Sequence, residues 1–347
     1  MPSDADLPMI SDPPVARAVP AELVRAESPA QSAPVPRIPA PFYGLSLGLF
    51  GATCLTTFFA GTMTAAGDPR TLSFDDWYRA GIEFSVCAMG ILLCHELGHY
   101  LQALRYGIPA LPPLFIPMPL SPFGTMGAVI VQQGGVGNRR QIFDIAVSGP
   151  LAGLAVTLPV LYYGLSQATY QDFSSADGAW VLGDPPLLLW MSEWVLGPKP
   201  EGTDVVLNPA LMAGWLGVFI TALNLVPVGQ LDGGHLLYTL IGKWAHVVAR
   251  VVVYGAFAVM LVTGSYSYLP MLFLIGMIGM RHPPTADDSV PIGWTRTIIG
   301  WGTLSFLLVG FTPDPFTILE PAPGAPAQRE EPLPFPRLPL QPGEIVV

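Results

Sequence analysis

The chain has 347 residues, of which 51% are hydrophobic and 12% are charged, and its mean hydropathy is +0.50. Water-soluble domains carry about twice that charged fraction, so the composition excludes an ordinary soluble globule and favours an integral membrane protein. The formal net charge of -10 argues against nucleic-acid binding, because contact with phosphates needs a basic surface.

Segments rich in proline and alanine stand at both ends of the sequence. Residues 1–40 and residues 312–347 contain too little apolar sequence to bury a core, which predicts two disordered tails. The first of them has no apolar centre of the kind that a signal peptide needs. Residues 41–311 are therefore predicted to form a single transmembrane domain.

Seven apolar stretches between the tails are candidates for membrane-spanning helices, each of which needs about 20 mainly apolar residues. They cover residues 42–63, 79–104, 142–166, 209–228, 247–264, 267–280 and 294–311. The predicted fold is an all-α polytopic membrane protein with about six or seven transmembrane helices. With the N-terminal tail in the cytoplasm, the inner segments hold ten Lys and Arg residues and the outer segments five. This bias favours that orientation.

Residues 111–135 are apolar but do not fit a spanning helix. Five prolines exclude a regular helix there: Pro112, Pro113, Pro117, Pro119 and Pro122. The alternating pattern after Gly124 indicates a strand. Since irregular backbone survives at membrane depth only where protein or a watery cavity satisfies it, we predict a re-entrant β-hairpin or loop that enters from the cytoplasmic side. The alternative is an apolar loop on the membrane surface.

The sequence His95-Glu96-Leu97-Gly98-His99 lies near the end of the second apolar stretch. Two histidines four positions apart share one face of a helix, so both imidazoles can reach one zinc ion, with Glu96 beside it as a general base. The alternative is a buried polar cluster that neighbouring helices satisfy. Ionisable groups inside a membrane are costly and usually functional, which favours the zinc site.

A catalytic zinc ion needs a third protein ligand, and no further histidine follows His99 closely. Asp232 is the best candidate, because it follows a turn rich in Pro and Gly and opens an apolar segment. An aspartate in that position can equally be a helix N-cap, and the spacing does not decide between the two roles. His235 could also bind the metal, although packing near the helix start is the simpler interpretation.

Two motifs together resemble the site-2 protease family of intramembrane zinc metalloproteases. The first is HELGH on an apolar helix, and the second is NLVPVGQLDGG, residues 224–234. The small-residue stretch SGPLAG at 148–153 also matches a motif on the helix between them. The resemblance covers roughly residues 75–245, which would be the catalytic core. It is nearest to the branch without a PDZ domain that plants, cyanobacteria and some archaea share.

The resemblance implies roles for five residues. His95, His99 and Asp232 would bind one Zn²⁺ per chain, and Glu96 would activate water. Asn224 would hold the extended substrate or the oxyanion, with an ordinary interhelical hydrogen bond as the alternative. Gly149 and Gly153 in SGPLAG form a pair of small residues four positions apart, which is typical of close helix packing.

The implied function is zinc-dependent cleavage of transmembrane segments of other membrane proteins. The expected partners are those substrates and the lipid bilayer. The expected location is a bacterial inner (cell) membrane, with the active site near its cytoplasmic side. The alternative is a metal-binding membrane transporter or scaffold without proteolytic activity, and a further rival is a zinc protease that cuts soluble or loop substrates at the membrane surface. The sequence does not indicate an oligomeric state.

Overall fold

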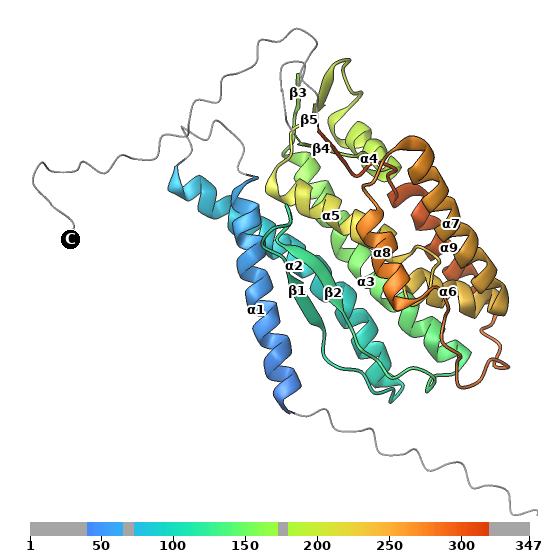
Figure 1. Ribbon diagram of the computed structural model, residues 1–347. Helices are drawn as coiled ribbons and strands as arrows, with labels where there is room; N and C mark the ends of the chain where they lie inside the picture. The colour runs from blue at the N-terminus through green and yellow to red at the C-terminus, as the bar shows by residue number, and fades with distance from the viewer. Residues whose placement is uncertain (1–39, 65–72, 173–179, 319–347) are drawn as a thin grey trace, which may run out of the picture. The chain divides into compact units, whose positions relative to one another are not determined.

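The computed structural model describes residues 40–64, 73–172 and 180–318 (Figure 1). The predicted tail over residues 1–39 and the last part of the other tail, residues 319–347, lie outside the described residues. The long helices are α1 Ala40–Thr62, α2 Phe74–Arg105, α3 Arg139–Ser166, α5 Pro209–Asn224, α7 Ala245–Thr263 and α9 Trp294–Gly310. The shorter helices are α4 Pro186–Leu196, α6 Asp232–Ile241, the 3-10 turn Gly242–Trp244 and α8 Leu269–Ile278.

Four helical stretches in the described part are long and apolar enough to cross a membrane: Phe42–Thr62, Phe74–Arg105, Arg139–Ser166 and Asp232–Thr263. The chain is therefore a mostly helical, multi-pass membrane protein. The other predicted spans coincide with shorter helices, since α5 has 16 residues, α8 has 10 and α9 has 17, against the roughly 20 residues of a typical span. A 16-residue helix measures about 24 Å, less than the hydrocarbon core of about 30 Å. The predicted count of six or seven spans is thus not confirmed.

The two longest helices, α2 and α3, begin at well-formed caps. The Ser73 hydroxyl accepts the Asp76 N–H, and the Asp76 carboxylate accepts the Ser73 N–H. Asn138 and Gln141 form the same reciprocal pair at the start of α3. Such capping boxes satisfy backbone donors that a helix start leaves without partners, so they set where both helices begin.

The centre of the fold is formed by α2, α3 and α5, which pack against one another (Figure 1). Glycines on α5 permit a close approach to α3, because a Cβ at Gly214 would lie 2.8 Å from the Leu161 Cα and one at Gly217 would lie 2.6 Å from the Thr157 hydroxyl. The indole of Trp215 is buried within this core. Its N–H donates to the Gly183 carbonyl at 2.7 Å, which satisfies the polar end of the ring.

The proline-rich stretch forms a β-hairpin that packs alongside α1 (Figure 1). Its strands are β1 Leu114–Pro117 and β2 Thr125–Val129, which pair antiparallel with an irregularity between Phe115 and Pro117. The Ser46 hydroxyl donates to the Pro113 carbonyl at 2.6 Å, and the Thr56 hydroxyl donates to the Gly124 carbonyl at 2.6 Å. The two contacts are ten residues apart on α1, so the hairpin packs along about 15 Å of that helix. The hairpin itself is as predicted, and whether it enters the membrane stays a prediction.

The chain beyond α9 contains a short strand that the sequence analysis did not predict. Strand β6 Phe316–Ile318 pairs antiparallel with β4 Trp180–Leu182, and a second small pair joins β3 Tyr170–Asp172 to β5 Thr203–Val205. The Phe316 ring lies 5.9 Å from the Trp215 ring and 6.0 Å from the Phe219 ring. These aromatic contacts hold residues 316–318 against the core, within the stretch 312–347 that the sequence predicts to be a tail.

An ion pair connects α9 to α3. The Arg296 guanidinium donates to both carboxylate oxygens of Asp144, at 2.7 and 2.9 Å, and the Tyr106 hydroxyl donates to the same carboxylate at 2.5 Å. Asp144 is mostly buried, so loss of its cation leaves a charge without compensation. Replacing Arg296 with Met is expected to lower the free energy of unfolding by about 1–3 kcal/mol, measured by thermal unfolding in detergent.

A double-mutant cycle isolates that pair. The Asp144→Asn, Arg296→Met double variant should lose less than the sum of the two single losses, with a coupling of about 1–3 kcal/mol. Additive losses would show that the pair does not contribute to stability.

Candidate metal centre

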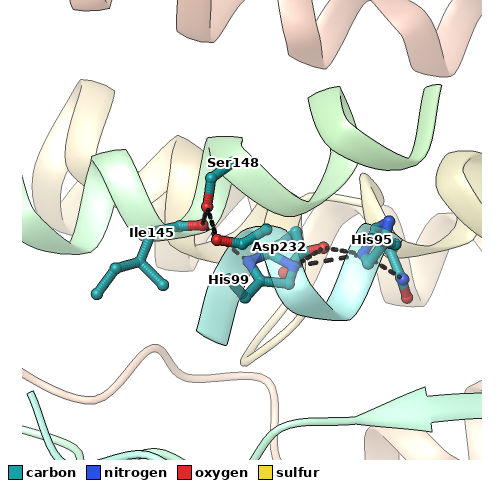
Figure 2. A network of polar contacts seen from close by, with 7 residues as sticks. His95, His99, Ile145, Ser148 and Asp232 are labelled. Atoms are coloured by element: carbon teal, nitrogen blue, oxygen red, sulfur yellow. Dashed lines mark hydrogen bonds and ion pairs between the residues drawn. The ribbon is translucent and has the colours of Figure 1, made fainter. Parts of the chain in front are cut away.

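Helix α2 brings His95 and His99 together one turn apart. Both side chains are buried, with 3% and 9% of their surface exposed, and their ring centroids are 5.0 Å apart. The two Nε2 atoms lie 3.3 Å from each other (Figure 2). This is the arrangement that the four-residue spacing predicts for a helix, since positions i and i+4 share a face.

Asp232 reaches the same place from a different part of the chain. It is the first residue of α6, and its Oδ2 atom lies 3.2 Å from the Nε2 atom of His95 and 3.2 Å from that of His99 (Figure 2). The N-cap of α6 is Leu231, and no side chain caps this helix. Of the two roles that the sequence left open for Asp232, helix capping is therefore excluded, because its carboxylate faces the histidines.

The three donor atoms have the separations of metal ligands. Four ligands bound to zinc at about 2.0–2.1 Å occupy the corners of a tetrahedron, whose edges are then about 3.3 Å long. The observed separations of 3.2, 3.2 and 3.3 Å match three corners. Two imidazoles and one carboxylate also form a donor set that zinc prefers. With both imidazoles neutral at Nε2, the lone pairs of the three donors would converge and repel one another, and a cation between them would turn this repulsion into attraction. The residues thus fit a tetrahedral zinc ion with one free corner.

The second nitrogen of His99 is held by the backbone of α3. Its Nδ1 atom lies 2.7 Å from the Ile145 carbonyl, which also accepts the Ser148 hydroxyl at 2.7 Å (Figure 2). A carbonyl can only accept, so Nδ1 carries a proton, and in the neutral ring the Nε2 lone pair faces His95 and Asp232. Hydrogen bonds of this kind orient a metal-binding imidazole and raise its basicity. The sequence analysis missed this contact, because no local pattern marks a backbone carbonyl as a partner.

Glycines of α3 provide the space for the two imidazoles. A Cβ atom at Gly149 would overlap the His99 ring, and one at Gly153 would lie 3.0 Å from the His95 Nδ1 atom. On α2, a Cβ at Gly98 would lie 2.5 Å from the Ser148 carbonyl oxygen. The prediction of close helix packing at Gly149 and Gly153 is confirmed, and the structure adds the reason: the imidazoles occupy the space that side chains would take.

The other residues singled out in the sequence are Glu96, Asn224 and His235. Glu96 is 5% exposed, on the same turn of α2 as His95, and is not one of the three grouped donors. The Asn224 amide nitrogen is 3.4 Å from the His95 Nε2 atom, so the end of α5 closes the site on that side. His235 does not join the three donors, and its Nδ1 atom instead pairs with the Nε2 atom of His282 at 2.6 Å. In the described part, His95, His99 and Asp232 are the group that could hold a metal ion.

Replacing Gly149 with Ala is expected to weaken zinc binding about 10- to 100-fold, the loss found when contacts that orient metal ligands are disturbed. The added methyl group would enter the space of the His99 ring. The affinity can be measured by competition with a chromogenic chelator on detergent-purified protein.

Gly90→Ala is the matched control for that substitution, because Gly90 lies on the histidine-bearing helix and a Cβ there meets nothing within 4 Å. This variant should bind zinc as the wild type does. Equal affinities in all three proteins would contradict the role assigned to Gly149.

Comparison with known proteins gives three kinds of result. The model of peptidase family M50 matches residues 83–264. Two relatives are from Arabidopsis thaliana. "Probable zinc metalloprotease EGY1, chloroplastic" is 28% identical, over 67% of this chain and 42% of the relative. "Probable zinc metalloprotease EGY2, chloroplastic" is 30% identical, over 56% of this chain and 35% of the relative. The EGY1 of Oryza sativa subsp. japonica is 27% identical over 71% of this chain and 43% of the relative. The chain spans about two fifths of the length of these relatives. No solved structure gives a significant match.

Proposed function

The chain belongs to peptidase family M50, and from this premise we propose that it is a zinc metalloprotease that cleaves membrane proteins within their transmembrane segments. The observation that carries the proposal is the set of separations, 3.2, 3.2 and 3.3 Å, between the donor atoms of His95, His99 and Asp232. These residues would hold one zinc ion. The names of the relatives, which are probable zinc metalloproteases, support the choice of metal.

Zinc bound there would lower the pKa of water to about 7 and polarise the scissile carbonyl. The chain's own residues supply the rest of the chemistry. Glu96 follows His95 on α2 and is buried, and we assign its carboxylate the task of accepting a proton from water and returning it to the departing amine. The Asn224 amide is a donor beside His95, and we assign it the task of holding the carbonyl oxygen of the substrate.

The hairpin is the best candidate for the surface that receives the substrate backbone. A transmembrane helix protects its own peptide bonds, so the substrate must unwind before attack. In the hairpin, β2 pairs with β1 on one side, and Val129 is 46% exposed. An unwound segment could add to this sheet and exchange helical hydrogen bonds for sheet hydrogen bonds. This role requires the hairpin to be re-entrant, as the sequence predicts.

We place the transmembrane protease domain at residues 41–311, with a catalytic core at about 75–245 that largely coincides with the family match at 83–264. The site should lie near the cytoplasmic side, because His99 is close to the end of α2 at Arg105 and the neighbouring α3 begins with Arg139 and Arg140. The relatives are named as chloroplastic proteins. They do not support the prediction of a bacterial inner membrane.

A cleavage assay in proteoliposomes tests the proposed function. Purified chain is reconstituted with single-span reporter polypeptides whose apolar segments carry Gly or Asn at graded positions, and mass spectrometry maps the cuts. We expect cuts within the apolar segment that 1,10-phenanthroline abolishes. Cuts confined to the polar flanks would identify a protease of the membrane surface instead. Zinc binding without any cleavage of the reporters would favour the transporter or scaffold.

A further inference from the structure

The segment between α8 and α9, residues 279–293, packs against α6, the helix that begins with Asp232 (Figure 1). The Nε2 atom of His282 pairs with the Nδ1 atom of His235 at 2.6 Å. The Tyr238 ring stacks on the His282 ring, with centroids 4.2 Å apart and planes at 9°. The Tyr238 hydroxyl donates to the Asp288 carboxylate at 2.8 Å. One side of α6 therefore contacts this segment over about one turn, from His235 to Tyr238.

The same segment is tied to the start of α3. The Ala286 N–H donates to the Gly137 carbonyl at 2.9 Å, and the Arg139 N–H donates to the Asp287 carbonyl at 3.1 Å. The Arg139 guanidinium in turn donates to the Thr239 carbonyl at the end of α6, at 2.7 Å. The α8–α9 segment and the first turn of α3 thus hold α6 near both of its ends. Because α3 also contacts His99 through Ile145, the two halves of the metal centre share one support.

The first turn of α6 needs such a support for a simple reason. An aspartate at a helix start normally steadies that end by capping, but the Asp232 carboxylate is turned toward His95 and His99, and no side chain caps α6. The preceding turn adds a backbone contact to the same segment, since a Cβ at Gly229 would overlap the Gly279 carbonyl. His235 lies three positions after Asp232, on a neighbouring part of the helix surface.

The His282 imidazole is 7% exposed and its second nitrogen, Nδ1, has no hydrogen-bond partner in the described part of the chain. Burying a nitrogen without a hydrogen-bond partner lowers the stability of the fold. Apolar burial alone therefore does not explain why a histidine occupies this position. Its one strong polar contact is the bond to His235. Burial, followed by the nearby His235 ring, lowers the pKa of His282 to about 3. The His282 ring therefore stays neutral near pH 7, and its hydrogen bond to His235 joins two imidazoles without a charge on His282.

We propose that His282 is a positioning residue: through its hydrogen bond to His235 it fixes the first turn of α6 and so holds the Asp232 carboxylate at ligand distance from the two histidines. The inference rests on the proposed zinc site. Residue 282 lies beyond the stretch matched by the family model, which ends at 264. Part of the metal centre's support thus comes from outside that stretch.

Zinc release from the full chain in detergent tests this role. We expect His282→Ala to release zinc to an excess of a chromogenic chelator about tenfold faster than wild type, by analogy with the loss of contacts that orient ligands. His282→Gln should restore slow release, because the glutamine amide can donate a hydrogen bond to His235. Arg281→Ala changes the exposed neighbouring residue and should release zinc at the wild-type rate.

Hydrogen–deuterium exchange of residues 229–236, with and without zinc, supplies a readout that does not depend on the metal. We expect faster exchange in His282→Ala and near wild-type exchange in His282→Gln. Unchanged release and exchange in His282→Ala would overturn the proposal, as would equally fast release in both variants. A wild type that binds no zinc would refute the proposed function. The exchange of the zinc-free proteins would still decide whether His282 orders the first turn of α6.

Discussion

Replacing Glu96 with Gln is expected to slow peptide hydrolysis by about 10²- to 10⁴-fold, the usual contribution of a general acid–base. The amide keeps the shape of the side chain but can no longer accept a proton from water. Glu96 is not among the three grouped donors, so the variant should bind zinc with unchanged affinity. The initial rate of reporter cleavage in proteoliposomes and the zinc content of the same preparation measure both quantities.

Glu83→Gln is the matched control, because Glu83 is another carboxylate on α2, twelve positions before His95. It should cleave the reporter at a rate close to wild type. If Glu96→Gln kept full activity, Glu96 would not be the base. If it lost zinc together with activity, its effect would be on the metal centre and not on proton transfer.

Replacing Asp232 with Ala is expected to weaken zinc binding by more than about 100-fold, beyond the range found for residues that merely orient ligands. The substitution removes one of three donors and leaves His95 and His99 in place on α2. Cleavage should fall with zinc occupancy and should recover in part when zinc is raised toward the new dissociation constant. Isothermal titration with zinc and a parallel activity series measure the two curves.

The exposed carboxylate of Asp287 provides a control of the same size and charge, and Asp287→Ala should titrate like wild type. Within the described residues, the Asp287 side chain accepts only the hydroxyl and backbone N–H of Ser289. If Asp232→Ala bound zinc with wild-type affinity, Asp232 would not be a ligand, and its role would be structural only.

The part of the site that could be predicted is the part encoded locally. HELGH places two imidazoles on one face because the helix itself supplies the geometry. Asp232 lies 133 positions after His99, and spacing alone could not distinguish a cap from a ligand. Only the packing of α6 against α3 shows that the Asp232 carboxylate faces the two histidines and does not cap the helix. The pairing of His235 with His282 is equally non-local, so the sequence showed His235 as a residue near the helix start without its partner.

The fold shows the same division between local and tertiary information. Apolar composition located every long helix of the described part, but it could not show that α5, α8 and α9 have only 16, 10 and 17 residues, at or below the lower end of the length that spans a bilayer. Strand β6 could not be predicted because its three residues follow a proline-rich stretch that gives no strand pattern. Its contacts with Trp215 and Phe219 are made with α5, which is distant in the sequence. Glycines 149 and 153 were correctly linked to packing, whereas the imidazoles that fill their space belong to another helix.

We propose that His95, His99 and Asp232 bind one zinc ion with one position left open. Zinc X-ray absorption on the detergent-purified wild type, combined with elemental analysis of the same sample, tests it most directly. We predict about one zinc per chain, bound by nitrogen and oxygen at about 2.0–2.1 Å with two imidazoles in the shell. Absence of zinc from protein purified without chelators, or a shell dominated by sulfur, would contradict this assignment.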